Sequence, residues 1–117
     1  MRCEELIAPA STGTRDLVRA WLESVLEPTL EDTLIAVDCS DLRSVTPSFV
    51  DEIMKIVLIE RQASRLSFIN PTERAKSYVS RSAQNRGVTD RVDVVAPPPR
   101  SAHRVRHWWA SPAAAAR

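Results

Sequence analysis

The stretch that decides the fold is Leu34–Glu52, which reads L-I-A-V-D-C-S-D-L-R-S-V-T-P-S-F-V-D-E. It begins with four consecutive apolar residues and then reaches Asp38. A short apolar run of this kind is typical of a strand buried on both faces, in a sheet covered by helices. Thr46-Pro47 then predicts a helix start, because a Thr hydroxyl accepts a first-turn N–H and Pro gives up an N–H that has no partner there. In open α/β sheets, sites form in the loop between a strand end and a helix start.

Apolar periodicity predicts that strands and helices alternate on both sides of this stretch. Strands are expected over residues 4–8, 34–38, 65–70 and 91–95, and helices over residues 15–27, 47–64 and 71–86. This alternation is typical of a small layered α/β domain with about four strands, three helices and an at least partly parallel sheet. The domain is expected to span residues 1–95, and the basic, Pro/Ala-rich segment 96–117 is predicted to be a disordered tail.

Individual residues predict the helix ends and faces. Thr14 is the expected N-cap of the first helix, Asn70 is the expected N-cap of the third helix with Pro71 at its first position, and Gly87 is its expected left-handed C-cap. The apolar stripe of the first helix comprises Leu17, Val18, Trp21, Leu22 and Val25. Three apolar residues of the second helix lie off its core-facing side. They indicate either that other parts of the chain pack on this helix from two directions or that the helix carries a binding patch for a partner. Cover within the chain is the preferred interpretation for these three residues, Ile56, Leu58 and Ile59.

The composition indicates an ordinary globular protein with room for one core. Of the 117 residues, 44% are hydrophobic and 26% are charged, and no apolar run approaches the roughly 20 residues of a membrane span. With no signal-peptide pattern, and with Cys3 and Cys39 expected as reduced, buried thiols, a cytoplasmic location is expected. The net charge is −7 over residues 1–60, +4 over 61–95 and +4 over 96–117. This polarity favours oriented docking to a charged partner over general nucleic-acid binding.

The segment from about residue 33 to residue 95 resembles the STAS domain, the fold of bacterial anti-sigma-factor antagonists and of sulfate-transporter tails. In that family an apolar strand ends in Asp, and a short turn leads to an Asp-Ser-Ser/Thr-Gly phosphorylation motif that opens a helix. Asp38 matches the strand-end Asp, and Thr46-Pro47-Ser48-Phe49 stands at the motif. The strings S-F-I-N-P-T-E-R-A-K-S-Y-V and R-G-V-T-D-R-V-D-V-V further along the chain also resemble the family's pattern.

Within the motif, Pro47 stands where the family has its phosphoacceptor serine, and Ser48 matches the second hydroxyl position. The string T-P-S-F-V-D-E is more similar to a divergent STAS-like branch of unassigned function, which carries Ser-Phe-x-Asp-Glu after a similar strand. The resemblance implies a non-catalytic regulatory module. It would bind a partner protein, such as an anti-sigma factor or a histidine-kinase-like ATPase, through the turn at residues 46–52.

Thr46 and Ser48 form the predicted phosphorylation or anion site. Both hydroxyls stand where first-turn N–H groups and the helix dipole favour negative charge. A phosphate there adds about two negative charges and would repel an acidic partner. The alternative is that Thr46 only caps the helix and that Ser48 only contacts solvent or backbone.

Asp38, Asp41, Asp51 and Glu52 are the predicted partner-binding carboxylates. A metal or acid–base site is the competing interpretation, but no His accompanies them, and adjacent helical residues point about 100° apart. Structural roles as helix caps, as turn formers and on a solvated helix face explain the four carboxylates more simply than a metal or acid–base site does. Asp51 and Glu52 are also expected to form an acidic docking surface beside Ser48. No metal or cofactor is expected. The chain holds only two glycines, which cannot build a Gly-rich phosphate loop, so it is predicted not to be an enzyme.

Two functions from other classes stay open. One is a small-ligand or nucleotide-binding sensor that uses the helix start at residues 47–49. The other is a structural subunit that forms homodimers or larger oligomers through the off-stripe residues of the second helix. The tail, with Trp108 and Trp109 among arginines, also fits binding to a membrane surface or to single-stranded nucleic acid. A solvated tail, or one whose tryptophans dock on the domain, is preferred to both.

Overall fold

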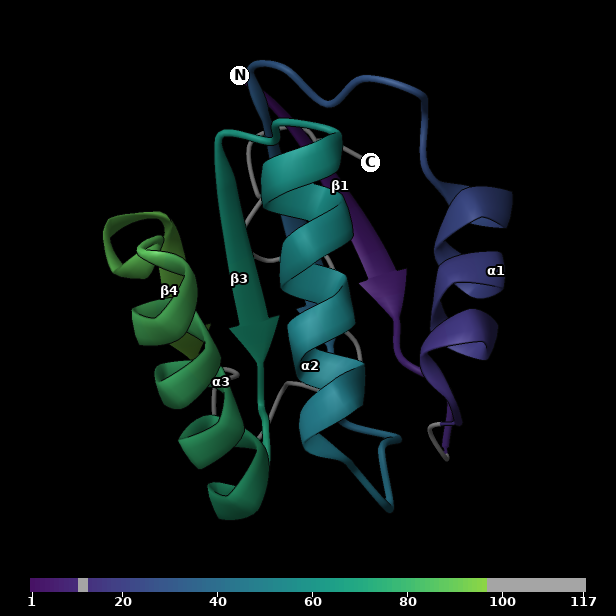
Figure 1. Ribbon diagram of the computed structural model, residues 1–117, viewed down its shortest axis with the longest axis vertical. Coiled ribbons are helices and arrows are strands. Elements are labelled where there is room, and N and C mark those ends of the chain that lie inside the picture. Colours follow the sequence, from purple (N-terminus) through teal and green to yellow (C-terminus); the bar gives the residue numbers. More distant parts are fainter. Residues whose placement is uncertain (11–12, 97–117) are drawn as a thin grey trace, which may run out of the picture.

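Strands and helices alternate along the chain in the computed structural model, which describes residues 1–10 and 13–96 (Figure 1). The strands are β1 (Arg2–Ile7), β2 (Thr33–Asp38), β3 (Arg65–Ile69) and β4 (Val92–Val95). The helices are α1 (Arg15–Val25), α2 (Pro47–Met54), its π-helical continuation (Lys55–Glu60) and α3 (Glu73–Arg86), and a 3-10 turn (Thr89–Arg91) precedes β4. The predicted α/β fold with four strands and three helices is confirmed, and the sheet is parallel throughout.

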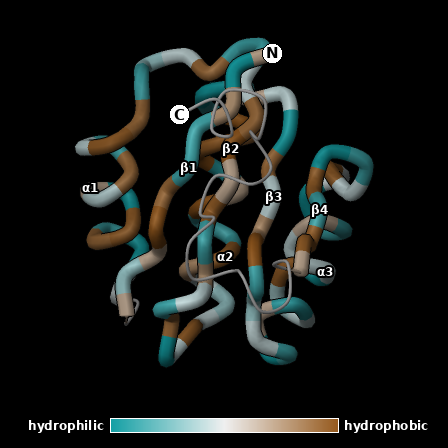
Figure 2. Tube along the Cα trace, turned by 180° about the vertical axis from the view of Figure 1, so that it is seen from behind, coloured by the Kyte–Doolittle hydropathy of each residue, from teal (hydrophilic) through white to brown (hydrophobic). Residues whose placement is uncertain are grey.

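The sheet has the strand order β1-β2-β3-β4, so each strand pairs with the next one along the chain. Connections between neighbouring parallel strands are right-handed in nearly all proteins. Because the strand order here does not reverse, such connections place every helix on the same side of the sheet. Figure 1 shows α1, α2 and α3 in front of the sheet, and Figure 2, seen from behind, shows strands with no described helix over them. The expectation that helices cover β2 on both faces is therefore wrong.

The core lies between the sheet and this single helical layer. Alternate side chains of the two central strands point toward the helices, as the period of a strand requires. Ile35 and Val37 of β2 and Leu66 and Phe68 of β3 belong to one buried cluster. The cluster continues into the helices through Val18, Leu22, Phe49, Val50, Ile53, Met54, Val79 and Ala83.

Helix α1 presents a narrower apolar face than predicted. Thr14 caps it as expected, and its hydroxyl accepts the Leu17 N–H at 3.3 Å. Val18 and Leu22 are buried, whereas the side chains of Leu17 and Val25 are exposed. Leu17 lies at the margin of the stripe on the side away from Leu22, and Val25 is the last residue of the helix. Helix α1 lies at one end of the helical layer with α2 as its helical neighbour (Figure 1).

The second helix changes register where α2 passes into the π-helix Lys55–Glu60, and it ends there instead of at residue 64. A π-turn closes i→i+5 hydrogen bonds, so it advances each side chain by less than an α-turn does. Ile56, Val57 and Leu58 consequently face the core one after another, and Ile56 is 0% exposed. Ile59 is 46% exposed. The preferred interpretation of cover within the chain is confirmed for Ile56 and Leu58, and only Ile59 of the three reaches the surface.

Helix α3 begins later than predicted. Thr72 is its N-cap in place of Asn70, because the Thr72 hydroxyl accepts the Ala75 N–H at 3.1 Å. Asn70 has φ 55° and turns the chain out of β3, so Pro71 precedes the cap instead of opening the helix. Gly87 closes the helix at φ 69°, as predicted, in the left-handed conformation that costs glycine least.

The predicted disordered tail lies outside the described residues, apart from Ala96. Within residues 1–10 and 13–96, no helix is both long enough and apolar enough to cross a membrane.

Substitution of Ile56 and Ile59 tests the π-helical register. Ile56→Ala leaves a cavity in the core and is expected to lower the free energy of unfolding by about 2–5 kcal/mol. Ile59→Ala, three residues away in the same π-helix, is expected to change it by less than about 0.5 kcal/mol. Urea denaturation measures both values, and equal losses for the two variants would contradict the register.

Candidate functional site

The turn between β2 and α2 is built largely by its own polar side chains. The Asp38 carboxylate accepts the Ser40 N–H at 2.9 Å, and the Cys39 N–H donates to the carbonyl of Ile69 at 2.8 Å. The Thr46 hydroxyl accepts the Phe49 N–H at 3.1 Å, with Pro47 at the first helical position. The helix start predicted at Thr46-Pro47 is therefore confirmed, and Thr46 acts as its cap.

A hollow of about 440 Å³ lies between the start of α2 and helix α3. Ser48 lines it and is half-buried there. The opposite wall is one stripe of α3, since residues three, four and seven positions apart share a helix face. The residues that line the hollow are Arg15, Pro47, Ser48, Asp51, Tyr78, Arg81, Ser82, Asn85 and Arg86. Three arginines against one carboxylate give this set a net positive charge.

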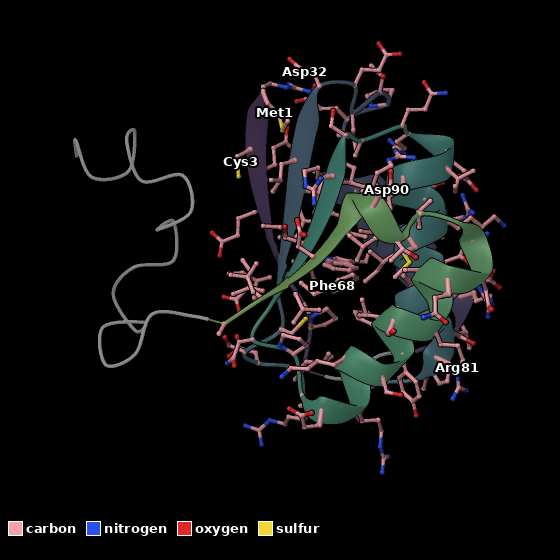
Figure 3. All side chains as sticks on the ribbon, turned by 90° about the vertical axis from the view of Figure 1, so that its left-hand side faces the viewer. Met1, Cys3, Asp32, Phe68, Arg81 and Asp90 are labelled. Carbon is pink, nitrogen blue, oxygen red and sulfur yellow. The ribbon has the colours of Figure 1, made fainter. Side chains whose placement is uncertain are left out.

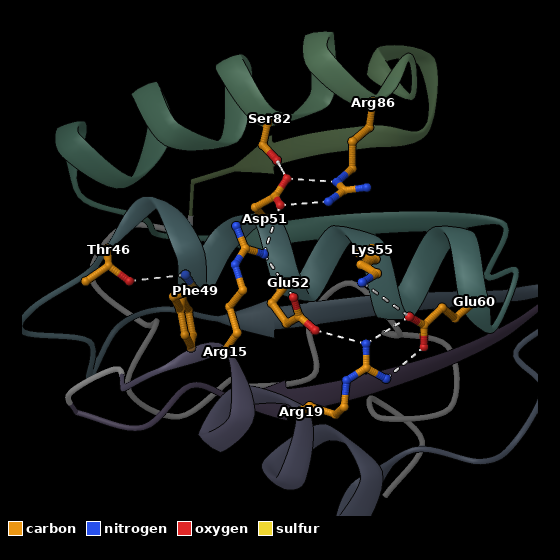
Figure 4. A network of polar contacts seen from close by, with 10 residues as sticks. All are labelled: Arg15, Arg19, Thr46, Phe49, Asp51, Glu52, Lys55, Glu60, Ser82 and Arg86. Atoms are coloured by element: carbon orange, nitrogen blue, oxygen red, sulfur yellow. Dashed lines mark hydrogen bonds and ion pairs between the residues drawn. The ribbon is translucent and has the colours of Figure 1, made fainter.

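Asp51 is the carboxylate of the hollow, and it is held from three sides (Figure 4). Arg86 donates to both carboxylate oxygens, from Nε at 2.8 Å and from Nη2 at 2.7 Å. The Ser82 hydroxyl donates at 2.6 Å, and Arg15 Nη1 donates at 3.0 Å. The hydrogen bonds from Arg86 first, and then those from Ser82 and Arg15, hold the pKa of the Asp51 carboxyl well below its usual range. Asp51 therefore stays ionised and fixes both arginines.

Glu52 points toward α1 and is only 3% exposed. Arg15 Nη1 donates to its Oε1 at 2.9 Å, and Arg19 Nη2 donates to its Oε2 at 3.0 Å. Arg19 also binds Glu60 through two hydrogen bonds of 2.9 and 2.8 Å, which lower the pKa of the Glu60 carboxyl. Two adjacent carboxylates of α2 thus bind arginines from different helices, and Arg15 binds both of them (Figure 4).

The predicted site residues are only partly brought together. Ser48 and Asp51 share the hollow, whereas Thr46, two residues before Ser48, caps the helix and does not line it. Glu52 is directed away from the hollow, into the pairs with α1. Both carboxylates of the predicted docking surface, Asp51 and Glu52, are occupied by arginines.

Asp38 and Asp41 lie away from the Ser48 hollow. Asp38 is buried under the turn that it stabilises. Asp41 is exposed and lines a separate hollow of about 540 Å³, with Arg43 and residues 7–10. The four predicted carboxylates therefore do not form one cluster.

The residues that sequence reasoning missed are the arginines around Ser48. Helix α3 carries a nearly uniform basic face, and Arg81 and Arg86 of that face line the hollow. The available signal was this basic face, combined with the parallel order that sets α3 beside α2. Arg15 gave no such signal, because its contacts with α2 join residues far apart in sequence.

Residues suited to metal binding or nucleophilic catalysis are sparse in the described chain. Over residues 1–10 and 13–96, no group of three or more His, Cys, Asp or Glu side chains is placed to hold a metal ion. Burial, and then the charge of Asp38, raise the pKa of the Cys39 thiol to about 12. Cys39 is consequently a neutral thiol at neutral pH, whereas a nucleophile needs the thiolate. Cys3 is exposed on the edge strand β1, so the expectation of a buried thiol is wrong for Cys3.

Comparisons with models of protein families, with curated proteins and with solved structures found no match. The similarity to STAS domains thus depends on the quoted residues alone.

The ionised state of Asp51 makes stability depend on pH. Its pKa is lowered by folding from an unfolded value of about 3.9. The stabilisation is therefore complete above that value and is lost as the pH falls below it. Asp51→Asn is expected to lower the free energy of unfolding by about 2 kcal/mol at pH 7. Urea denaturation from pH 6 to pH 3 should show a steeper loss in the wild type than in the variant.

The matched control is Asp41→Asn, the same change at an exposed loop carboxylate. It is expected to leave stability at pH 7 within about 0.5 kcal/mol of the wild type. Identical pH profiles for the wild type and Asp51→Asn would contradict the assigned role of Asp51.

Proposed function

We propose that this chain is a non-catalytic regulatory module that binds a partner protein, as its resemblance to STAS domains implies, through the hollow at Ser48. The observation that carries the proposal is the position of Ser48, half-buried at the start of α2 among Arg15, Arg81 and Arg86. The dipole of α2 and the three guanidinium groups both favour an anionic group in that space. An acidic side chain of the partner is the group that fits.

The arginines of the hollow contribute to binding in two different ways. Arg15 and Arg86 are held by Asp51, so their positions are set before a partner arrives. Arg81 is exposed on α3 and supplies the charge that an incoming group meets first. Prepositioned charges lower the ordering cost of binding and speed oriented encounter. Asp51 and Glu52 thereby serve docking indirectly, by holding arginines.

A phosphate on Ser48 would use the same arginines. It carries about two negative charges and strong acceptor oxygens, so it competes with Asp51 for Arg15 and Arg86 and fills the space that a partner carboxylate needs. Modified Ser48 would therefore exclude an acidic partner, both by occupying the hollow and by like-charge repulsion. By the same resemblance, the partner class is an anti-sigma factor or a histidine-kinase-like ATPase, met in the cytoplasm.

The second candidate function is a sensor for a nucleotide or another small phosphorylated ligand. The same arginines and helix start favour it, because phosphate binds at helix N-termini and to arginine. A rise in melting temperature with nucleotides that Arg81→Glu abolishes would support the sensor in place of the protein-binding module.

Charge reversal at the hollow tests the protein-binding proposal. Arg81→Glu and Ser48→Asp place a negative charge in the hollow and are expected to abolish capture of the partner from a lysate. With the captured protein purified, each variant is expected to weaken the Kd at least about tenfold, or 1.4 kcal/mol. Capture is read by mass spectrometry and the Kd by calorimetry.

The control is Arg74→Glu, the same reversal at an exposed position of α3 outside the hollow. It should retain both capture and Kd. Equal capture by the wild type and all three variants would remove the hollow from the proposal. Loss in Arg81→Glu but not in Ser48→Asp would keep the docking surface and remove the switch.

A further inference from the structure

The face of the sheet opposite the helices carries its own apolar hollow. In Figure 3, Cys3 points away from the helices, whereas Phe68 points into the space between them and the sheet. Residues in register with Cys3 alternate with core residues and so lie on its side. Six residues of this side line a hollow of about 430 Å³: Cys3, Leu34, Ala36, Ser67, Ile69 and Val95. We call this side the open face.

The described helices leave the open face uncovered. Cys3 is exposed there, and Leu34 and Val95 are half-buried. Helices α1, α2 and α3 all lie on the other side of the sheet, as Figure 2 shows from behind. Apolar side chains in this position gain free energy when another apolar segment covers them.

The open face and the C-terminal segment carry opposite charges. Glu5, Asp38 and Asp93 occupy strand positions on the open face. Arg65 is a base on that face, and it pairs with Asp93 at 2.7 Å. Arg2 also lines the hollow, and it pairs with Glu27 at 3.0 Å. Residues 97–117 carry four arginines and no acidic residue. This complementarity favours the segment as the occupant over a second acidic surface.

The described chain ends beside the open face. Val95, the last residue of β4, lines the hollow, and 21 residues follow Ala96. From Val95 to Cys3 the path crosses three strand spacings and about four residues of strand, roughly 20 Å in all. The chain from Ala96 to Trp108 spans roughly 40 Å when extended. Trp108 therefore has the reach to contact every residue of the hollow.

We propose that residues 97–117 fold back over the open face, with Trp108 and Trp109 packed over Cys3, Leu34 and Val95. The two indole rings supply the apolar area, because a tryptophan buries about 150–250 Å². The arginines of the segment then lie over the acidic positions of the face. The chain covers its own second face in this way, and another protein or a second copy gains access to that face only by displacing the segment.

Bimane attached to Cys3 in the full-length protein reports this contact. Bimane emission is quenched when an indole ring touches the dye, and Cys39, the other thiol, is buried. Emission from the wild type is expected to be strongly quenched. The Trp108→Phe/Trp109→Phe variant is expected to recover it several-fold, with unchanged circular dichroism. Trp21→Phe, on the helical side of the sheet, is the control and should leave the emission as in the wild type.

Two results would overturn the proposal. Equal emission from the wild type and the double variant would mean that the tryptophans do not reach the open face. Quenching that weakens on dilution, with dimers seen by light scattering, would assign the contact to a second copy. The test is independent of the Ser48 hollow, which lies on the other side of the sheet, so failure of one proposal leaves the other standing.

Discussion

Two adjacent carboxylates on one helix organise the helical layer. Asp51 and Glu52 point in different directions from α2, and each must be paired because a partly buried charge without a partner is costly. Arg86 of α3 and Arg19 of α1 meet this need, and Arg15 bridges both carboxylates. Stacking of Trp21 on Phe49, with ring centroids 6.1 Å apart, adds an apolar contact between α1 and α2. These pairs, together with the apolar core beneath them, hold α1 and α3 against α2.

The same pairs shape the surface at Ser48. By fixing Arg15 and Arg86, Asp51 keeps two guanidinium groups beside the start of α2. The Asp51 carboxylate therefore preorganises the arginines of the hollow without itself binding the incoming group. An anion that enters the hollow competes with Asp51 for the same donors, so occupancy of the site and contact between the helices are coupled. In the proposed function, this coupling would let a bound partner influence the packing of the whole helical layer.

Local chemistry was predictable from the sequence, and long-range geometry was not. Thr46-Pro47 and Gly87 identified a helix start and a helix end, because capping depends on neighbouring residues. Asn70 and Thr72 are both good caps, and only the turn of the chain out of β3 selects Thr72. The periodicity of the second helix was interpreted with the α-helical period, which fails once the π-helix begins. The apolar run of β2 could not reveal that all helices lie on one side, nor could Asp51 reveal that its partner is Arg86.

The pairing of Asp51 with Arg86 is the central claim, and a double-mutant cycle measures it most directly. Urea denaturation of the wild type, Asp51→Ala, Arg86→Ala and the double variant at pH 7 gives the coupling free energy between the two side chains. Because the pair is bidentate and partly buried, we expect a coupling of about 2 kcal/mol or more. A value within about 0.5 kcal/mol of zero, as for an exposed surface pair, would contradict the account.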